Sequence, residues 1–222
     1  MTSLQVNKPE TISASIALDT WLPIPWERFA LLIEQPAYEK NKAYYHNGQM
    51  RIESLPTGSD HAKAHSILVV LIGLFAMVEK IALDPRDACS YRQAGMTDFQ
   101  PDISYYVADT VGIVPDGIRI IDLAQYPKPE LVIEVSDTTL ADDIGEKRLM
   151  YENLRIPEYW VWDVQKTELL AFSVADEGTS QQIRHSHVLP GLSLELLTET
   201  LKRCKASDQS AGGAWFMAQL QS

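Results

Sequence analysis

Two acidic residues occupy apolar, β-prone segments in which a carboxylate is unusual. Asp102 comes directly before the run 103–107, and Glu134 lies within the run 131–135. An ionised carboxylate in an apolar strand is costly unless it is paired with a cation or holds a metal ion. If the two strands are neighbours, the carboxylates supply the hard oxygen ligands that Mg²⁺ and Mn²⁺ prefer. In the alternative interpretation, Glu134 pairs with Lys147 or an arginine, and Asp102 caps a turn.

Lys147 is the basic residue best placed to join these carboxylates. It lies about two turns into a predicted helix at 141–154, and Tyr151 follows one turn later on the same face. If this helix packs back on the sheet, Lys147 can reach the carboxylates. In the alternative, Lys147 forms a solvent-exposed pair with Asp143 at i, i+4, which contributes only about 0.2–0.5 kcal/mol.

The histidines offer a second, weaker set of candidate ligands. His61 and His65 are one helical turn apart and could bind Zn²⁺ together, but no Glu follows His61 as in HExxH and no third ligand is evident. We therefore do not expect zinc. His61 is instead placed either at the rim of a cleft near Glu53 or on the surface. His185 and His187 alternate in a strand-like segment without an identifiable partner.

Apolar periodicity and turn residues predict the elements that position these side chains. Two extended segments at 44–53 flank Asn47-Gly48, a dipeptide typical of tight hairpin turns. After a loop that begins at Pro56, Ser59 or Asp60 is expected to cap a helix with a wide apolar face. The other predicted elements are a short helical stretch ending at Leu32, strands at 89–92, 103–107 and 131–135, a helix at 141–154, a hairpin of strands at 159–162 and 169–174, and a final helix at 193–204.

Length and composition limit the possible classes of protein. The 222 residues, 45% of them hydrophobic, fit one well-buried domain. The longest apolar run, 67–78, is too short to cross a bilayer and is expected to be a buried helix. Two distant cysteines and the lack of an N-terminal signal pattern indicate a disulfide-free cytoplasmic protein. The net charge of -11 argues against broad, non-specific attraction to nucleic acid, so a phosphodiester would need cations to approach.

The chain is divided into three predicted parts. Residues 1–20 are polar and are expected to form a flexible tail, residues 21–204 one domain, and residues 205–222 a C-terminal tail or short helix. The aromatic residues near Trp160 are expected in the core or in a dimer contact. A homodimer with two sites on a two-fold axis is therefore expected, without contact with a membrane.

Several short segments of the sequence form an ordered set. They are Asn47-Gly-Gln-Met-Arg-Ile-Glu-Ser54 with Pro56 and His61, Phe99-Gln-Pro-Asp-Ile-Ser104, Pro129-Glu-Leu-Val-Ile-Glu-Val-Ser136, Lys147 with Tyr151, and Ile156-Pro-Glu-Tyr-Trp-Val-Trp-Asp163. Together they resemble the restriction endonuclease family often called Uma-two, a branch of the PD-(D/E)XK nuclease superfamily. The similarity extends from about residue 20 to 195. Each string is weakly specific, but their order makes the resemblance strong.

The resemblance implies an α/β (α+β) fold in which a mixed sheet is flanked by helices and the site lies where two strands diverge. Asp102 matches the PD aspartate and Glu134 the acidic residue of (D/E)XK. Ser136 stands where that pattern has lysine. Because family members resemble one another in supplying the lysine from the next helix, Lys147 is the implied replacement. Glu53 is the implied third acidic residue of the metal sphere.

The implied function is a Mg²⁺- or Mn²⁺-dependent endonuclease acting on DNA. Asp102, Glu134 and Glu53 would hold the metal, Lys147 would assist the chemistry, and His61 and Tyr151 are possible accessory residues. A different class of function is also open, in which the chain keeps a nuclease-like fold as an inactive binding or scaffold protein. The acidic composition favours the scaffold, whereas the presence of all four site residues favours the enzyme.

Overall fold

The computed structural model describes residues 16–54 and 58–221, so residues 1–15 of the predicted tail and the predicted loop residue Pro56 lie outside the described residues. The helices are α1 Trp26–Ile33, α2 Ser59–Glu79, α3 Leu140–Asp142, α4 Arg148–Asn153, α5 Leu194–Ala206 and α6 Gln209–Leu220. The strands are β1 Leu22–Pro23, β2 Ala43–His46, β3 Gln49–Ile52, β4 Leu83–Asp87, β5 Ser90–Gln93, β6 Thr97–Phe99, β7 Ile103–Val107, β8 Ile120–Asp122, β9 Leu131–Ser136, β10 Glu158–Asp163, β11 Glu168–Val174 and β12 Ser180–Gln182.

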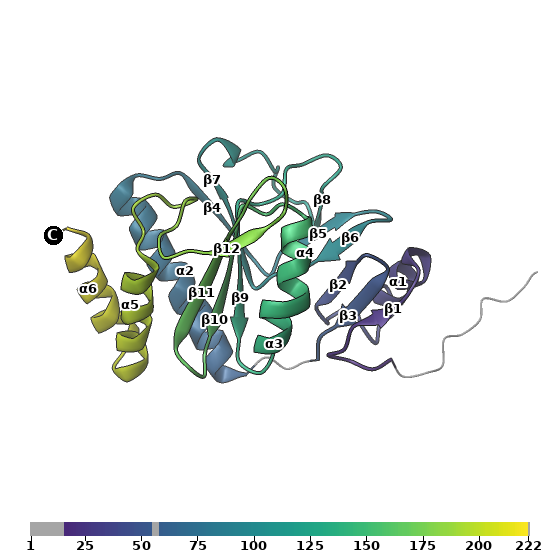
Figure 1. Cartoon of the computed structure of the whole chain (residues 1–222), viewed down its shortest axis with the longest axis horizontal. Coiled ribbons are helices and arrows are strands. Elements are labelled where there is room, and N and C mark those ends of the chain that lie inside the picture. The colour runs from purple at the N-terminus through teal and green to yellow at the C-terminus, as the bar shows by residue number, and fades with distance from the viewer. Residues whose placement is uncertain (1–15, 55–57, 222) are drawn as a thin grey trace, which may run out of the picture.

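The central sheet has the strand order β12-β11-β10-β9-β7-β4 (Figure 1). It is mixed, because β9 and β10 run parallel while the other neighbouring pairs are antiparallel. The predicted hairpin of 159–162 with 169–174 is confirmed as β10–β11. The predicted α/β architecture, with mixed sheets flanked by helices, is confirmed as well.

A second sheet, with the order β1-β3-β2-β6-β5-β8, lies beside the central one. Its β2–β3 hairpin turns at Asn47 and Gly48, which have φ angles of 49° and 76°. These positive angles are what an Asn-Gly turn supplies, so the predicted hairpin is confirmed. Figure 1 shows the hairpin with β1 and α1 at the end of the molecule opposite α5 and α6.

Five of the strands, β1, β4, β6, β8 and β12, were not predicted from the sequence. Strand β4 contains Pro85 and three charged residues and is an edge strand paired only with β7. Proline is tolerated at an edge, where one side of the strand is unpaired. Strands β6 and β8 have three residues each, too few for a visible alternation of side chains.

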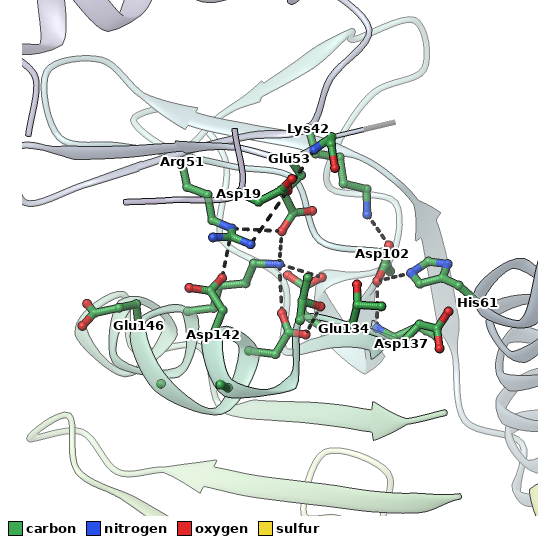
Figure 2. A pocket seen from close by; sticks show the side chains of 18 of the residues that line it. Asp19, Lys42, Arg51, Glu53, His61, Asp102, Glu134, Asp137, Asp142 and Glu146 are labelled. Atoms are coloured by element: carbon green, nitrogen blue, oxygen red, sulfur yellow. Dashed lines mark hydrogen bonds and ion pairs between the residues drawn. The ribbon is translucent and has the colours of Figure 1, made fainter. Parts of the chain in front are cut away.

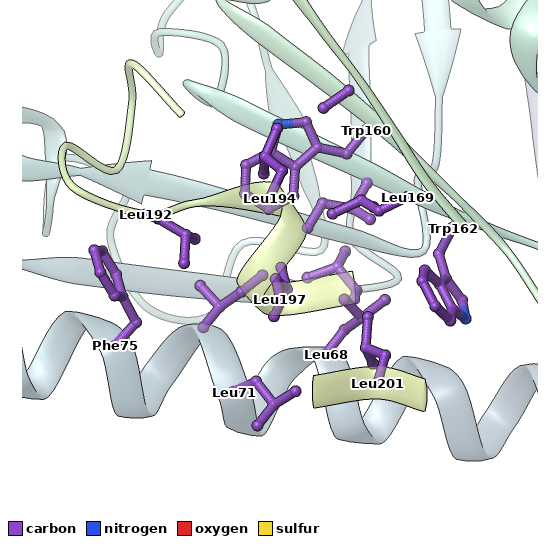
Figure 3. Packing of buried hydrophobic residues seen from close by; sticks show 14 of the residues in the cluster. Leu68, Leu71, Phe75, Trp160, Trp162, Leu169, Leu192, Leu194, Leu197 and Leu201 are labelled. Atoms are coloured by element: carbon purple, nitrogen blue, oxygen red, sulfur yellow. The ribbon is translucent and has the colours of Figure 1, made fainter. Parts of the chain in front are cut away.

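The two faces of the central sheet are covered differently. On one face, apolar side chains of β7, β9 and β10 pack against α2, α5 and α6. Figure 3 shows Leu68, Leu71 and Phe75 of α2 opposite leucines of α5, with Trp160 and Trp162 of the sheet above them. On the other face, Val132 and Val161 pack with aromatic residues of α4 and the second sheet. Trp160 and Trp162 are buried, as expected for core residues.

Helix α2 is long and apolar enough to cross a membrane by length and composition alone. One face of the helix is instead buried in the largest core cluster, through Ile67, Leu68, Leu71, Ile72 and Phe75, whereas Val70 and Met77 are exposed. The prediction of a buried helix is thus confirmed. The predicted cap is wrong: Gly58 is the N-cap residue and no side chain caps the helix.

The predicted helix at 141–154 is present but irregular. It begins as α3, continues through the π-helical turn Asp143–Lys147, and ends as α4. Gly145 has non-helical angles of φ −101° and ψ −106° within the turn. A π-turn changes which residues share a helix face, and such turns are frequent at functional sites. Both Asp143 and Lys147 at its ends are buried.

The C-terminal segment forms helix α6, which packs on α5 and α2. Phe216 is fully buried in the main core cluster. Gly212 lies directly against Cys204 of α5, so close that a Cβ atom there would clash with the sulfur of Cys204 and lie tightly against its backbone. Of the two alternatives predicted for this segment, the short helix is the one observed.

Candidate functional site

The predicted site residues meet at a cavity of about 940 Å³ between the two sheets and the π-turn (Figure 2). Its acidic lining residues are Asp19, Glu53, Asp102, Glu134, Asp137, Asp142, Asp143 and Glu146. Its basic lining residues are Lys42, Arg51, Lys147 and, when protonated, His61. The lining thus carries eight carboxylates against three permanent cations, an excess that favours a bound cation.

Asp102 precedes β7 and is buried. Its Oδ2 atom accepts the backbone N–H of Val135 at 2.7 Å and contacts Nε2 of His61 at 3.1 Å, while its Oδ1 atom pairs with Lys42. Burial alone would raise the pKa of Asp102, but the hydrogen bonds and charges of His61 and Lys42 outweigh it and hold this pKa well below its ordinary value. Asp102 is therefore ionised at neutral pH.

Glu134 projects from the middle of β9 and is 2% exposed. Its Oε1 atom accepts hydrogen bonds from the hydroxyl groups of Tyr151 at 2.9 Å and Tyr44 at 3.2 Å, and its Oε2 atom lies 3.8 Å from Lys147. Burial raises the pKa of Glu134 to about 8, although the charge of Lys147 opposes the rise. The nearby cations therefore do not fully compensate this carboxylate.

Lys147 ends the π-turn with its side chain only 2% exposed. Its Nζ atom lies 2.6 Å from Glu53, 2.9 Å from Asp143 and 3.8 Å from Glu134. It also lies 4.4 Å from the ring centre of Tyr44, on its face. Burial alone would lower the pKa of Lys147, but the carboxylates raise it well above its ordinary value, so the side chain stays a cation.

The alternative of a solvent-exposed Asp143–Lys147 pair is therefore wrong. The i, i+4 pair exists, but both of its side chains are buried and it is part of a larger cluster. The other alternative, in which Glu134 pairs with Lys147, describes a contact that does exist. Pairing and metal binding are compatible here, because the cavity holds more carboxylates than cations.

The open end of the β2–β3 hairpin contributes two charged residues. Lys42 precedes β2 and Glu53 follows β3, and the backbone N–H of Glu53 donates to the carbonyl of Lys42 at 2.9 Å. The hairpin thus places a cation and a carboxylate side by side at the cavity. Lys42 reaches Asp102, whereas Glu53 reaches Lys147 and, at 3.4 Å, Arg51.

Arg51 joins the hairpin to the π-turn segment. It is buried in β3, with its Nε atom 3.0 Å from Asp142. Asp142 also accepts the indole N–H of Trp21 at 2.6 Å. Figure 2 shows Arg51 between Asp19, Glu53 and Asp142, on the opposite side of the cavity from His61. These contacts fix the position of the hairpin relative to the helix that carries Lys147.

Both histidines of the predicted pair contact Asp102. The rings of His61 and His65 are stacked, with centroids 6.5 Å apart, and both Nε2 atoms contact Asp102, one its side chain and the other its carbonyl. His61 therefore lies at the cavity, as one of the two predicted alternatives had it, although that alternative placed it near Glu53 and its observed partner is Asp102. His185 and His187 are exposed and do not line the cavity.

The donor set fits a hard divalent cation. Asp102 and Glu134 offer carboxylate oxygens at one wall of a cavity whose lining has more carboxylates than cations. Within residues 16–54 and 58–221, no three carboxylate or imidazole groups form a ready metal cage. Mg²⁺ commonly binds through one or two carboxylates, keeping water and substrate oxygens as its other ligands. The third predicted ligand, Glu53, is separated from Glu134 by Lys147, and its ligand role stays a prediction.

The structure brings all six predicted site residues to this region. Asp102, Glu134, Lys147, Glu53 and His61 line the cavity, and Tyr151 supports Glu134 from behind. Sequence reasoning did not find the roles of Lys42, Tyr44, Arg51 and Asp142. Most of their partners are distant in the chain. Only Arg51 could have been found from the sequence, because it lies two residues before Glu53 in the predicted hairpin and therefore on the same face of the strand.

Comparisons with known proteins give one family match and one similar solved structure. The model of the family Uma2, described as "Putative restriction endonuclease", matches residues 26–204. The crystal structure of a protein from Anabaena variabilis, described as a "putative nuclease belonging to DUF820", is similar with a TM-score of 0.55 and 16% sequence identity. The similarity covers 81% of this chain and 99% of that chain, and at this identity it concerns the fold. No curated protein matches the chain.

Proposed function

Because the chain belongs to the Uma2 family of restriction endonuclease-like proteins, we propose that it is a divalent-metal-dependent endonuclease that hydrolyses phosphodiester bonds of DNA. One observation carries the proposal: Asp102 and Glu134, on neighbouring strands, face a cavity with an excess of carboxylates and a buried lysine. Two carboxylates with adjacent open space are the usual protein contribution to a Mg²⁺ site that acts on phosphates.

Asp102 and Glu134 would hold Mg²⁺ or Mn²⁺. When bound, such an ion lowers the pKa of water and stabilises the charge that develops on the phosphate. The protein fixes its two carboxylates beforehand: the amide of Val135 and the ring of His61 orient Asp102, and Tyr151 and Tyr44 orient Glu134. Rigid placement of such groups avoids reorganisation during the reaction.

Lys147 would act as a fixed positive charge and hydrogen-bond donor. Its raised pKa keeps it protonated, so it cannot accept a proton from water at neutral pH. Its ammonium lies between Glu53 and Glu134, where it can hold a water molecule by donation or offset charge in the transition state. Glu53 and Asp143 hold the ammonium in this position.

A thermal-shift titration tests the metal part of the proposal. Mg²⁺ or Mn²⁺ should raise the melting temperature of the wild type, because a ligand that binds only the folded state stabilises it. Asp102→Asn should remove most of the rise, while the matched control Asp176→Asn, at an exposed position, should retain it. A full rise in Asp102→Asn would place the metal elsewhere.

Cleavage assays on single-stranded, duplex and branched DNA test the chemical part. Metal-dependent cleavage of any of these that Asp102→Asn abolishes supports the proposal. A protein that binds the metal and cuts none of them would instead fit the binding or scaffold function, which the net charge of -11 favours. The homodimer expected from the sequence stays a prediction, and light scattering at micromolar concentrations tests it.

A further inference from the structure

Lys42 differs from the other cations of the cavity in how it is held. Its side chain is 20% exposed, whereas that of Arg51 is 5% and that of Lys147 is 2% exposed. Lys147 contacts three carboxylates and Arg51 lies within 4.0 Å of three, but within the described part of the chain Lys42 is ion-paired with Asp102 alone. Lys42 is therefore the cation of this lining that can leave its partner at the lowest cost.

The pairing occupies one particular atom of Asp102. The Oδ2 atom is taken by the amide of Val135 and by His61, both part of the cavity wall. The Oδ1 atom is taken by Lys42, which reaches it from the hairpin across the cavity (Figure 2). A metal ion that approaches Asp102 from the cavity must compete with the ammonium of Lys42 for this oxygen.

We propose that Lys42 is an exchangeable cation, which pairs with Asp102 in the metal-free protein and binds a phosphate oxygen of the substrate once a divalent ion has taken its place. This inference rests on the proposed function. A lysine suits both positions, because its flexible stem carries a compact charge with three donors. A cation that binds phosphate also suits this site, because its acidic lining must accept an anionic substrate.

The first measurement is metal affinity by isothermal titration with Mg²⁺. Lys42→Met removes the competing charge and leaves the contacts of Asp102 with Val135 and His61. The Kd of this variant for Mg²⁺ should therefore be at least about tenfold lower than that of the wild type, equivalent to about 1.4 kcal/mol of binding free energy. Lys40→Met is the matched control, since it removes the same charge at an exposed position two residues earlier. Lys40→Met should bind Mg²⁺ with a Kd within about twofold of the wild type.

The second measurement is binding of a short DNA duplex, followed by fluorescence anisotropy at several salt concentrations with Ca²⁺ as the metal. A lysine that binds phosphate contributes about one unit to the slope of log K against log salt. Lys42→Met should lower that slope by about one and weaken binding, whereas Lys40→Met should not. Lys42→Arg keeps the charge and should resemble the wild type in both measurements.

The outcomes separate this inference from the proposed function. Tighter metal binding together with a lower salt slope supports the inference, and so does Mg²⁺ binding that emerges only in Lys42→Met. Equal or weaker metal binding by Lys42→Met overturns it while leaving the proposed function intact, as does an unchanged salt slope. If neither the wild type nor Lys42→Met binds the metal, both the inference and the proposed function are overturned. If Lys42→Met does not fold, Lys42→Gln takes its place under the same criteria.

Discussion

Two buried glutamates on neighbouring strands differ in their hydrogen-bond partners and in the space around them. Glu158 of β10 and Glu134 of β9 are 0% and 2% exposed. Glu158 accepts hydrogen bonds from neutral groups: the indole of Trp160 at 3.0 Å, the hydroxyl of Ser186 at 2.9 Å, and the backbone N–H groups of His187 and Val188. Glu134 instead meets two tyrosines and an ammonium at the edge of a cavity.

The difference shows that burial of a carboxylate does not by itself identify a functional site. Glu158 is enclosed by donors from the loop after β12 and ties that loop to the sheet, so its role is structural. Glu134 faces space that a ligand can enter, and the surrounding charge is unbalanced. The open cavity beside Glu134, with its surplus of carboxylates over cations, therefore distinguishes this carboxylate from Glu158.

The largest expected effect separates the two glutamates by activity. Glu134→Gln should lower the rate of DNA cleavage at least about a thousandfold, equivalent to about 4 kcal/mol of transition-state stabilisation. The amide oxygen can still accept from Tyr151 and Tyr44, so the fold should persist. Single-turnover cleavage and circular dichroism measure the two effects. Cleavage within tenfold of the wild-type rate would remove Glu134 from the chemistry.

The next effect concerns the ammonium that the Glu134 region has and the Glu158 region lacks. Lys147→Met should lower the free energy of unfolding by about 3–5 kcal/mol, because it leaves Glu53, Asp143 and Glu134 without their common cation. Urea denaturation measures the loss. Lys166→Met is the control: this lysine is 68% exposed and 3.9 Å from Asp163, and its loss should cost less than about 1 kcal/mol.

The solvent-exposed Asp143–Lys147 pair considered from the sequence would instead give a loss of only about 0.2–0.5 kcal/mol. A loss below about 1 kcal/mol would mean that water or a shifted carboxylate proton compensates for the missing charge. Mg²⁺ should restore part of the stability in Lys147→Met, because a divalent cation offsets the same carboxylates.

A smaller effect is expected at the structural glutamate. Glu158→Gln should lower the free energy of unfolding by about 1–3 kcal/mol, because the amide offers fewer acceptors to its donors. Its melting temperature should still rise with Mg²⁺ by the same amount as that of the wild type. A reduced rise would show that the two carboxylate regions are coupled, contrary to the comparison.

The most gradual effect is the dependence of stability on pH in metal-free protein. Burial raises the pKa of Glu134 from 4.5 to about 8, so the folded state binds more protons than the unfolded state between these values. The contribution of Glu134 to stability is therefore complete below pH 4.5 and is lost as the pH rises through 8. Denaturation between pH 5 and 9 should show a decline that is absent in Glu134→Gln and retained in Glu158→Gln. An equal decline in all three proteins would contradict the assignment to Glu134.

Much of the fold follows from local features of the sequence. The Asn47-Gly48 turn, the apolar runs that form β7, β9, β10 and β11, and the helical spacing in α2 are all properties of neighbouring residues. Such features act through backbone angles and side-chain periodicity, which need no knowledge of distant contacts. Asp102 and Glu134 lie next to or within these apolar runs, so local features also indicated two carboxylates of the cavity, whereas Glu53 was implied by the family resemblance.

Only the tertiary structure decided how the charges are paired. Lys42 meets Asp102 across 60 residues of sequence separation, and Tyr44 meets Glu134 across 90. Pairing at such separations depends on how two sheets and a helix are packed, which the local periodicity of the sequence does not indicate. The Asp143–Lys147 pair has the same i, i+4 spacing whether it is exposed or buried, yet its energy differs greatly between water and a protein interior. The sequence therefore determined which residue types the site contains, whereas packing determined their dielectric environment, their partners and the cavity that a substrate could enter.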